Sequence, residues 1–488
     1  MARKHLKHMP AESTSGLGGG TWTTSKTLVA AAIVLFVLTR AYLLFIGRPM
    51  ISDVPMYFGY AVKAVDLQQT PYTEEFVMPY PPLAYWTTCA PRMFDERRIT
   101  NNRDPQIVPI FFDYSRGFRG LMFLCDLASF TLLLLIARKR RPQMAGWAAL
   151  LYILTTTILG PVLFDRLDVV LLMLMMSGLY CWTPSLNHSP LSPFGRGAQR
   201  VPGGEGESRW SIAWATLAYA IFGLGISFKI IPLLSLPFFL LADFHAPRRY
   251  VRLASAIIVL TATISVPFLI QWSATGPSVF GIFKFHAERE IHLESLYSSL
   301  MSLASVFGPA VFISHSHGAF NLSGDLSGAM KILSTIVLLG FLTGEGLWAL
   351  LRWSRYTRQD AYRIACYVIP GSVILSNVLS PQYFIWAIPL LLLLAVEIFP
   401  EGYVRPLVLA ALLIAVAVMT TWIFPYNFIT QESNPNPYAL VPINAEPLKL
   451  PPATTPAVIL GLRNFTYLGV VIWLGVMLYK RIDQVNEQ

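Results

Sequence analysis

The chain has 488 residues, of which 54% are hydrophobic and only 13% are charged. An ordinary soluble domain carries about 25% charged residues, so this composition excludes a soluble globular protein. The net charge is +10, but lysine and arginine occur in short clusters between apolar runs. This distribution argues against nucleic acid as a partner and is typical of topology signals in membrane proteins.

Apolar runs long enough to cross a bilayer recur along almost the whole chain. They predict an all-α polytopic membrane protein, a bundle of about twelve transmembrane helices. The first run has no small-residue cleavage site after it, so we expect a retained helix and not a signal peptide. The expected helices lie near residues 27–46, 117–137, 144–163, 167–183, 211–228, 230–244, 252–271, 327–351, 361–378, 383–399, 405–424 and 456–479.

Basic residues mark every second loop, which places these loops and both chain ends in the cytoplasm. The expected organisation is a cytoplasmic tail over residues 1–26, a transmembrane domain over 27–480 and a cytoplasmic tail over 481–488. The Gly/Pro/Ser-rich stretch 184–209 is typical of a flexible cytoplasmic linker.

Three long loops then lie on the extracytoplasmic face, at residues 47–116, 272–326 and 424–455. The first loop is rich in proline and aromatic residues, which favours short interfacial helices over disorder. We expect the functional chemistry of the protein on this face of the cell membrane.

Ionisable and polar residues gather at the expected extracytoplasmic ends of the helices. A charge near the bilayer is costly, so it usually pairs, lines a polar cavity or takes part in function. We therefore expect a shared cavity, lined by carboxylates from early helices and cations from later ones. The residues that the topology brings to this end are Asp53, Asp165, Arg166, Asp168, Lys229, His286, Arg289, His292, Glu294, Gln382 and Tyr383.

Simpler structural roles compete with this interpretation. Asp53 is also a favourable N-cap for a helix that begins near Val54. The acids and the arginine at 165–168 are equally typical of a local ion pair that closes a helical hairpin. Lys229 at a helix end is typical of a lysine that extends to the membrane interface.

The other polar residues have structural explanations that do not require a function. Asp126, Glu345 and Arg463 lie within apolar runs, where hydrogen bonding between helices is the ordinary explanation. His315 and His317 form a His-x-His pair in a Ser/Gly-rich segment without nearby carboxylates, which we interpret as a solvated loop and not as a metal site. The four cysteines have no spacing typical of metal or redox sites, and we interpret them as small core residues.

Several stretches resemble motifs of one enzyme family. The sequence SDVPMY at 52–57 is similar to its first-loop acidic motif, and PYTEEF at 71–76 with YPPL at 80–83 is similar to two further first-loop segments. On these motifs the chain resembles the GT-C superfamily of integral membrane glycosyltransferases, and most closely glycosyltransferase family 87, the polyprenol-phosphate-mannose-dependent mannosyltransferases. Further similar segments follow in the family's order at residues 164–168, 227–232, 285–289, 294–295 and 379–383.

The resemblance implies a polyprenyl-phosphate sugar donor, a glycolipid or glycan acceptor and membrane lipids as the partners of the protein. It also implies that Asp53, which matches the first-loop acid, is the catalytic base of an inverting transfer. Mannose is the sugar of the family, and arabinose or another pentose is an open alternative. Pro79 stands where the family has an acid, so Glu74 or Glu75 would have to replace that acid.

The departing lipid phosphate needs positive charge and hydrogen-bond donors. Our candidates for binding it are Arg166, Lys229, His286 and Arg289. No cofactor is required, no residue is assigned to a metal, and a divalent metal is left open. The candidates for substrate binding are Tyr57, Glu75, Tyr80, Asp165, Asp168, Gln382 and Tyr383, of which the tyrosines serve equally well as interfacial anchors.

The main alternative function is a transporter or flippase of lipid-linked saccharides. Transporters usually contain internal repeats and broken helices near the bilayer midplane. The sequence shows no such repeat, and its polar residues gather at one end, which favours the transferase.

Overall fold

The computed structural model describes residues 26–46, 53–101, 104–183, 209–400, 402–423, 448–449 and 455–487. The chain is an all-α polytopic membrane protein with one small β-sheet. The α-helices of the described part are α1 (Lys26–Ala41), α2 (Val54–Ala61), α3 (Pro82–Met93), α4 (Ile107–Arg140), α5 (Pro142–Ile158), α6 (Gly160–Leu163), α7 (Asp168–Trp182), α8 (Arg209–Phe228), α9 (Leu236–Phe244), α10 (Arg249–Thr275), α11 (Gly281–Ala287), α12 (Leu296–Ala304), α13 (Ser327–Leu351), α14 (Arg358–Leu375), α15 (Tyr383–Ile398), α16 (Val404–Ile423) and α18 (Thr455–Glu487).

Short 3-10 and π segments connect or extend these helices. In the described part they are η1 (Tyr42–Ile46), η2 (Val62–Asp66), η4 (Ile231–Ser235), η5 (Gly276–Phe280), η6 (Ser305–Phe307) and η7 (Trp353–Arg355). Seven helical segments among the described residues are long and apolar enough to cross a membrane, and four shorter apolar helices accompany them.

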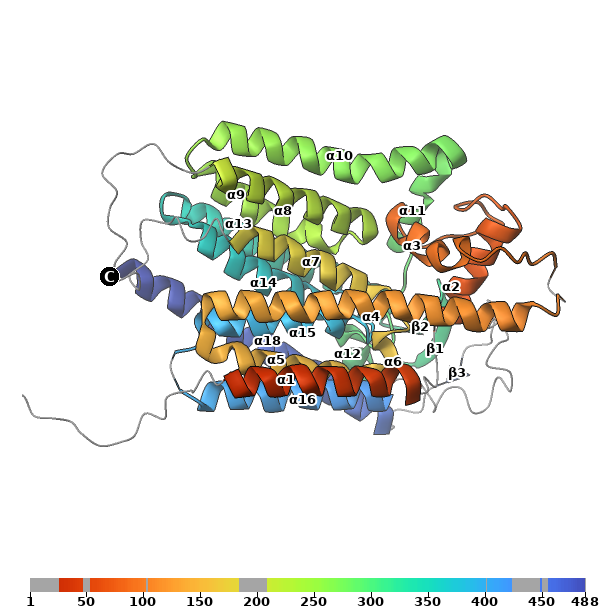
Figure 1. Ribbon diagram of the computed structural model, residues 1–488. Helices are drawn as coiled ribbons and strands as arrows, with labels where there is room; N and C mark the ends of the chain where they lie inside the picture. Colours follow the sequence, from red (N-terminus) through yellow and green to blue (C-terminus); the bar gives the residue numbers. More distant parts are fainter. Residues whose placement is uncertain are drawn as a thin grey trace, which may run out of the picture.

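The long helices lie side by side in one bundle (Figure 1). Helix α8 packs against α7 and α10, and α4 packs against α5 and α7. Helix α15 contacts α4, α5, α7, α14 and α18, and almost all of its residues are buried. Its sequence has no polar face, which suits a helix that other helices surround on all sides.

All twelve expected helices are present, most of them within a few residues of the expected bounds. Helix α4 is the main exception, because it begins at Ile107 and not near residue 117. The extra turns carry Asp113 and Arg116, whose polarity suggested a loop. These two side chains form an ion pair of 3.3 Å on the helix surface, so the helix extends beyond its apolar span.

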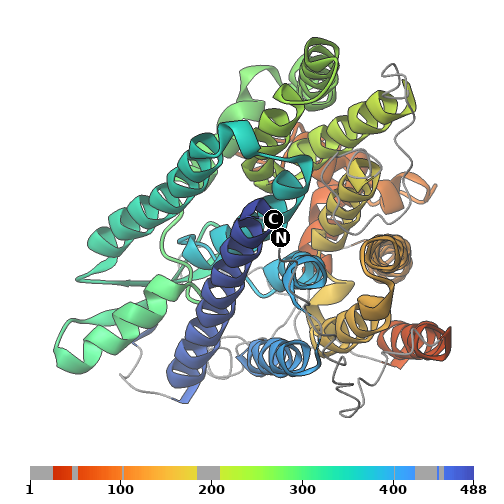
Figure 2. The ribbon, with the colours of Figure 1, turned by 90° about the vertical axis from the view of Figure 1, so that its left-hand side faces the viewer.

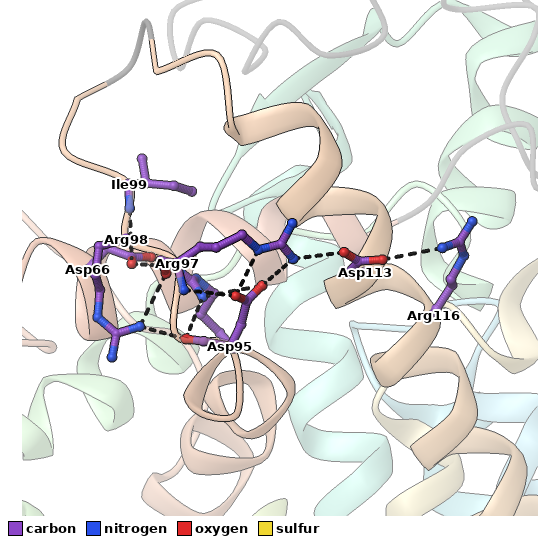
Figure 3. Close-up of polar contacts among 8 residues, drawn as sticks. Asp66, Asp95, Arg97, Arg98, Ile99, Asp113 and Arg116 are labelled. Atoms are coloured by element: carbon purple, nitrogen blue, oxygen red, sulfur yellow. Dashed lines mark hydrogen bonds and ion pairs between the residues drawn. The ribbon is translucent and has the colours of Figure 1, made fainter.

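The first expected loop folds into α2 and α3, two of the short helices expected there. The buried side chains of Asp66 and Arg92 join them, with 2.9 Å between Asp66 Oδ2 and Arg92 Nε. Arg97 bonds both Asp95 and Asp113, at 2.6 and 2.7 Å, and so ties this unit to the start of α4 (Figure 3). The loop is thereby fixed against the bundle end.

The second expected loop contains an element that the sequence analysis missed. Strands β1 (Val311–Ser316) and β2 (Ala319–Gly324) form an antiparallel hairpin, and β3 (Leu448–Lys449) pairs with the other edge of β1. The interpretation as a solvated loop was wrong for His315, which lies on β1, whereas His317 lies in the turn of the hairpin. His317 and Gly318 have φ values of 52° and 67°, which the two-residue turn of a tight hairpin requires.

The charged residues within apolar runs bond other helices, as expected. Asp126 of α4 accepts hydrogen bonds from Arg40 of α1 at 2.8 Å and from Tyr152 of α5 at 2.6 Å. Glu345 of α13 accepts a bond from Tyr479 of α18. These polar pairs hold helices together where water is absent.

Helices α2, α3 and α11 and the β-sheet gather at one end of the bundle, at the right in Figure 1. The C-terminal end of α18 lies at the opposite end. The expected tail over 1–26, the linker over 184–209 and the loop over 424–455 fall outside the described residues, apart from Lys26, Arg209, β3 and the first residue of α18. The assignment of these ends to sides of a membrane stays a prediction.

Candidate functional site

A cluster of charged side chains lies where the short helices meet the bundle. It contains Asp53, Arg119, Asp165, Arg166, Asp168 and Lys229, and these residues come from segments far apart in the sequence. We call these six residues the charged cluster. Five of them are candidates that the sequence analysis named.

Asp53 forms an ion pair with Arg166. It immediately precedes α2, yet its side chain makes no capping hydrogen bond to that helix. The capping interpretation was therefore wrong for the carboxylate, which is directed to Arg166 instead. The Asp53 and Arg166 side chains are 18% and 14% exposed, so a substrate has access to the pair.

Asp165 and Asp168 also bind cations from other elements. Arg119 of α4 holds Asp165 through two hydrogen bonds, of 2.7 and 3.1 Å. Asp168 accepts bonds from Lys229 Nζ at 2.7 Å and from Trp386 Nε1 at 2.9 Å. The sequence analysis held a local ion pair within 165–168 to be as good an explanation as a substrate role. The contacts give each charged residue of this turn a partner in a different helix or loop.

Lys229 lies in the break between α8 and η4, where Pro232 prevents α8 from continuing. Besides its bond to Asp168, its ammonium lies 4.5 Å from the centre of the Tyr383 ring, the first residue of α15. The side chain is only 23% exposed. Lys229 therefore does not extend to the membrane interface, and it contributes a directed positive charge to the cluster.

Tyr57 and Tyr80 form a pair beside these charges. Their hydroxyl oxygens are 3.4 Å apart, and Tyr57 stacks on Phe118 of α4. Burial is the main cause that raises the pKa of both hydroxyls well above the ordinary value, and the charge of Asp168 acts in the same direction. Both tyrosines therefore stay protonated and can donate hydrogen bonds.

Within the described part of the chain, the Arg289 side chain makes no ion pair and no hydrogen bond. It lies within electrostatic reach of Tyr80 and His292, since its charge lowers the pKa of both side chains. His286 also lies beside it, and its Nε2 is 3.1 Å from the backbone oxygen of Pro79. The segment that follows α11 thus brings an unpaired positive charge toward the tyrosine pair.

His292 is a buried neighbour that the sequence analysis placed at this end of the bundle without assigning it a binding or catalytic role. Burial is the largest cause that lowers its pKa to about 3, followed by the charges of Arg289, Arg463 and Arg166. Its Nδ1 accepts a hydrogen bond from the Glu294 amide, and the ring also bonds the Leu379 backbone. The imidazole is therefore neutral and fixes the backbone around Arg289.

Two predicted substrate-binding residues lie apart from these contacts. Glu75 is exposed, and Lys63 bonds its backbone oxygen and not its carboxylate. Gln382 precedes α15 and accepts a hydrogen bond from Ser380. The structure does bring together Asp53, Arg166, Asp168, Lys229 and Tyr383, with Asp165 in the same turn.

The sequence analysis missed Arg119 and Trp386. Trp386 lies in the apolar run of α15, where one indole N–H gives little signal, whereas Arg119 lies in a polar stretch together with Asp113 and Arg116. A second buried pair joins Arg463 of α18 to Glu294, and Asn464 bonds the Ser295 carbonyl at 3.0 Å. This pair anchors the segment that carries Arg289 and His292 to the bundle.

The arrangement supplies two kinds of chemistry at one place. Asp53 is a partly exposed carboxylate that can accept a proton, and Arg166, Lys229 and Arg289 are cations suited to a phosphate. No group of three or more His, Cys, Asp or Glu side chains within the described residues is arranged to hold a metal ion.

No family model matches the sequence, and no curated protein matches it. Among solved structures, the chain is similar to the crystal structure of ArnT from Cupriavidus metallidurans bound to undecaprenyl phosphate, with 15% identity and a TM-score of 0.44 over 93% of this chain and 77% of that chain. It is also similar to ArnT from the same organism in the apo state, with 14% identity and a TM-score of 0.45 over 92% and 78% of the two chains. At these values neither a shared fold nor a shared activity follows.

The fold and the site together define a polytopic helical membrane protein with a charged cluster at one end of its bundle. The resemblance to glycosyltransferase family 87 stays a prediction, as do the roles of the individual site residues.

Proposed function

We propose that the protein is a membrane glycosyltransferase of the GT-C type that uses a polyprenyl-phosphate sugar as its donor. The observation that carries this proposal is the Asp53–Arg166 ion pair beside the Lys229–Asp168 pair. A carboxylate able to accept a proton lies next to cations able to bind a phosphate, and both lie at one end of helices that lipid surrounds. A lipid-linked phosphosugar meets both requirements.

In the proposed reaction, a hydroxyl of the acceptor attacks the anomeric carbon of the donor sugar. Asp53 accepts the hydroxyl proton while the new carbon–oxygen bond forms. The bond between the anomeric carbon and the phosphate oxygen breaks, and the polyprenyl phosphate leaves with the electron pair. Attack opposite the leaving group inverts the configuration of the sugar.

The cations stabilise the negative charge that the leaving phosphate gains. Arg289 is available to bind it, because no protein carboxylate in the described part holds its guanidinium. Lys229 keeps its position through Asp168 and Tyr383. The protonated hydroxyls of Tyr57 and Tyr80 add hydrogen-bond donors that suit sugar or phosphate oxygens.

Arg166 links donor binding to the ability of Asp53 to accept a proton. A carboxylate that is paired with an arginine is a poor base, because the cation stabilises its charge. A donor phosphate competes with Asp53 for Arg166 and so leaves Asp53 free to accept the acceptor proton. The base would then be active only when the donor is present.

The sugar is mannose in this proposal, the acceptor is an extracytoplasmic glycolipid or glycan, and both chain ends lie in the cytoplasm. Cysteines introduced at exposed Glu96 and at Gln484 test the orientation, since the native cysteines are buried. In intact cells, an impermeant maleimide should label position 96 and spare position 484. The opposite labelling pattern would contradict the proposed topology.

The function itself is tested by incubating the purified protein in proteoliposomes with radiolabelled polyprenyl-phosphate sugars and a lipid extract as acceptor. We expect label to move from the donor to a new product for one of the sugars. Movement of intact donor between leaflets, without a new product, would instead show a flippase.

A further inference from the structure

A cavity of about 360 Å³ lies between the β-hairpin and the first turn of α13. It is formed by residues outside the charged cluster. We call it the hairpin cavity, and a volume of this size falls within the range of small-molecule sites. The polar and aromatic side chains among its lining residues are Glu290, Phe312, Ser323, Asp325, Ser327 and Lys331.

The polar groups of the hairpin cavity are held in fixed positions. Glu290 Oε2 accepts hydrogen bonds from Ser314 at 3.1 Å and Ser323 at 3.4 Å, and Asp325 Oδ2 accepts one from the Ala310 amide at 2.8 Å. Ser327 Oγ is buried and has no hydrogen-bond partner within the described residues. A buried hydroxyl without a partner is costly, so a bound polar ligand would stabilise this wall.

The charge of the lining selects a class of ligand. Two carboxylates and one ammonium line the hairpin cavity, so its formal charge is negative and disfavours a phosphate. Carboxylates, hydroxyls and one half-buried aromatic ring, that of Phe312, instead suit a neutral molecule with many hydroxyl groups. A saccharide has this chemistry.

The hairpin cavity continues onto an apolar surface. A second hollow on α13 shares Lys331 with it and is otherwise lined by Ile332, Thr335 and Ile336. Ile332 and Ile336 are 63% and 61% exposed, and α13 is one of the helices able to cross a membrane. Helix α13 lies at the periphery of the bundle (Figure 2), so this surface faces lipid. A ligand there has a polar head and a hydrocarbon tail.

The same chain segment borders the hairpin cavity and reaches the charged cluster. Glu290 lines the cavity, and the positive charge of the preceding Arg289 lies close enough to Tyr80 to lower the pKa of its hydroxyl. The backbone that follows is fixed by hydrogen bonds to β2, from Leu322 to Ile291 and from Leu293 to Phe320, each of 2.9 Å. The segment that carries Arg289 and Glu290 therefore takes part in both regions, through Arg289 near Tyr80 and through Glu290 in the wall of the hairpin cavity.

We propose that the hairpin cavity binds the saccharide head of a neutral glycolipid, with the lipid tail along the exposed face of α13. The binding of a neutral glycolipid does not require the proposed transfer function.

Photo-crosslinking tests the proposal without any transfer reaction. Benzoylphenylalanine replaces Thr335 in the full chain, which is reconstituted in phosphatidylcholine vesicles with a tritiated lipid. We expect several-fold more label from glucosyl diacylglycerol than from diacylglycerol or phosphatidylglycerol. The same crosslinker at Ile258 of α10, which is 66% exposed, should show no preference.

A matched pair of variants tests whether the preference for glucosyl diacylglycerol depends on the hairpin cavity. Gly328 lines the cavity and Gly340 lies farther along α13, and a Cβ atom at either position meets nothing within 4 Å. Gly328→Trp should fill the cavity and abolish the preference, whereas Gly340→Trp should keep it. Thermal unfolding of both variants confirms that they fold.

Equal labelling by glucosyl diacylglycerol and diacylglycerol would overturn the proposal, as would a preference for phosphatidylglycerol or a preference that survives in Gly328→Trp. Asp53→Asn should leave the crosslinking unchanged. The binding site and the proposed transfer chemistry therefore fail or succeed in separate measurements.

Discussion

Asp53 and Arg166 are joined by an ion pair, although one precedes α2 and the other lies in the turn before α7. The pair holds a carboxylate and a cation, side by side and partly exposed, at the end of the bundle where the short helices gather. Because both groups have access to solvent, neither is simply a buried structural charge. This relationship is the basis of the proposed site.

Arg289→Gln should reduce sugar transfer without reducing thermal stability. The guanidinium has no protein partner in the described part of the chain, so its loss leaves no buried carboxylate unpaired. Removal of a group that stabilises transition-state charge lowers kcat by about 100-fold or more. Transfer rates and thermal unfolding in the same detergent measure the two effects. A fall in melting temperature that accounts for the lost activity would contradict the assignment.

Lys229→Met should destabilise the protein, because it leaves the buried Asp168 carboxylate without its cation and, within the described part of the chain, with Trp386 as its bonded partner. The double variant Lys229→Met/Asp168→Asn removes both charges and should recover much of the melting temperature. Transfer should stay low in the double variant, since the cation is still absent. Recovery of transfer together with stability would show that the Lys229 charge is only structural.

His292 should make the stability of the protein sensitive to mild acid. The folded state keeps its pKa near 3, whereas an unfolded histidine has a pKa of 6.5. Between these values the unfolded state binds a proton that the folded state does not, so the free energy of unfolding falls as the pH decreases below 6.5. The slope is at most about 1.4 kcal/mol per pH unit for one group.

Thermal unfolding at pH 7 and pH 5 measures this effect of His292. The His292→Gln variant has no titrating ring at this position and should lose less stability over the same interval. An equal loss in both proteins would show that other groups cause the acid sensitivity.

The sequence predicted the helices well where a continuous apolar run was the dominant signal. The apolar run of α15 has no competing interpretation, and its burial follows from the same composition. The start of α4 was missed because Asp113 and Arg116 looked like loop residues, although both lie on the helix and form ion pairs at its surface. The hairpin was missed because its Ser/Gly-rich sequence was interpreted as a solvated loop, although its two strands and their two-residue turn are local in the sequence.

The location of the candidate site was predictable from the sequence, but the ion-pair partners of its charged residues were not. Alternation of basic loops placed Asp53, Arg166 and Lys229 at one end, where the structure has them. The choice of partner depends on how the helices pack, so the sequence offered a local ion pair as an equal alternative and did not predict the bond from Arg166 to Asp53. The contributions of Arg119 and Trp386 depend on the same packing.

The central claim is that Asp53 is the base of a sugar transfer, and the Asp53→Asn variant tests it most directly. Asparagine keeps the shape of the side chain but cannot accept the proton, and the loss of a general base costs about 100- to 10,000-fold in rate. Glu96→Gln is the control, because Glu96 is an exposed acid of the same loop. With the radiolabelled donor selected in proteoliposomes, we expect Asp53→Asn to lose transfer while it still folds and Glu96→Gln to keep it. Transfer by folded Asp53→Asn at a rate near that of the unaltered protein would contradict the account.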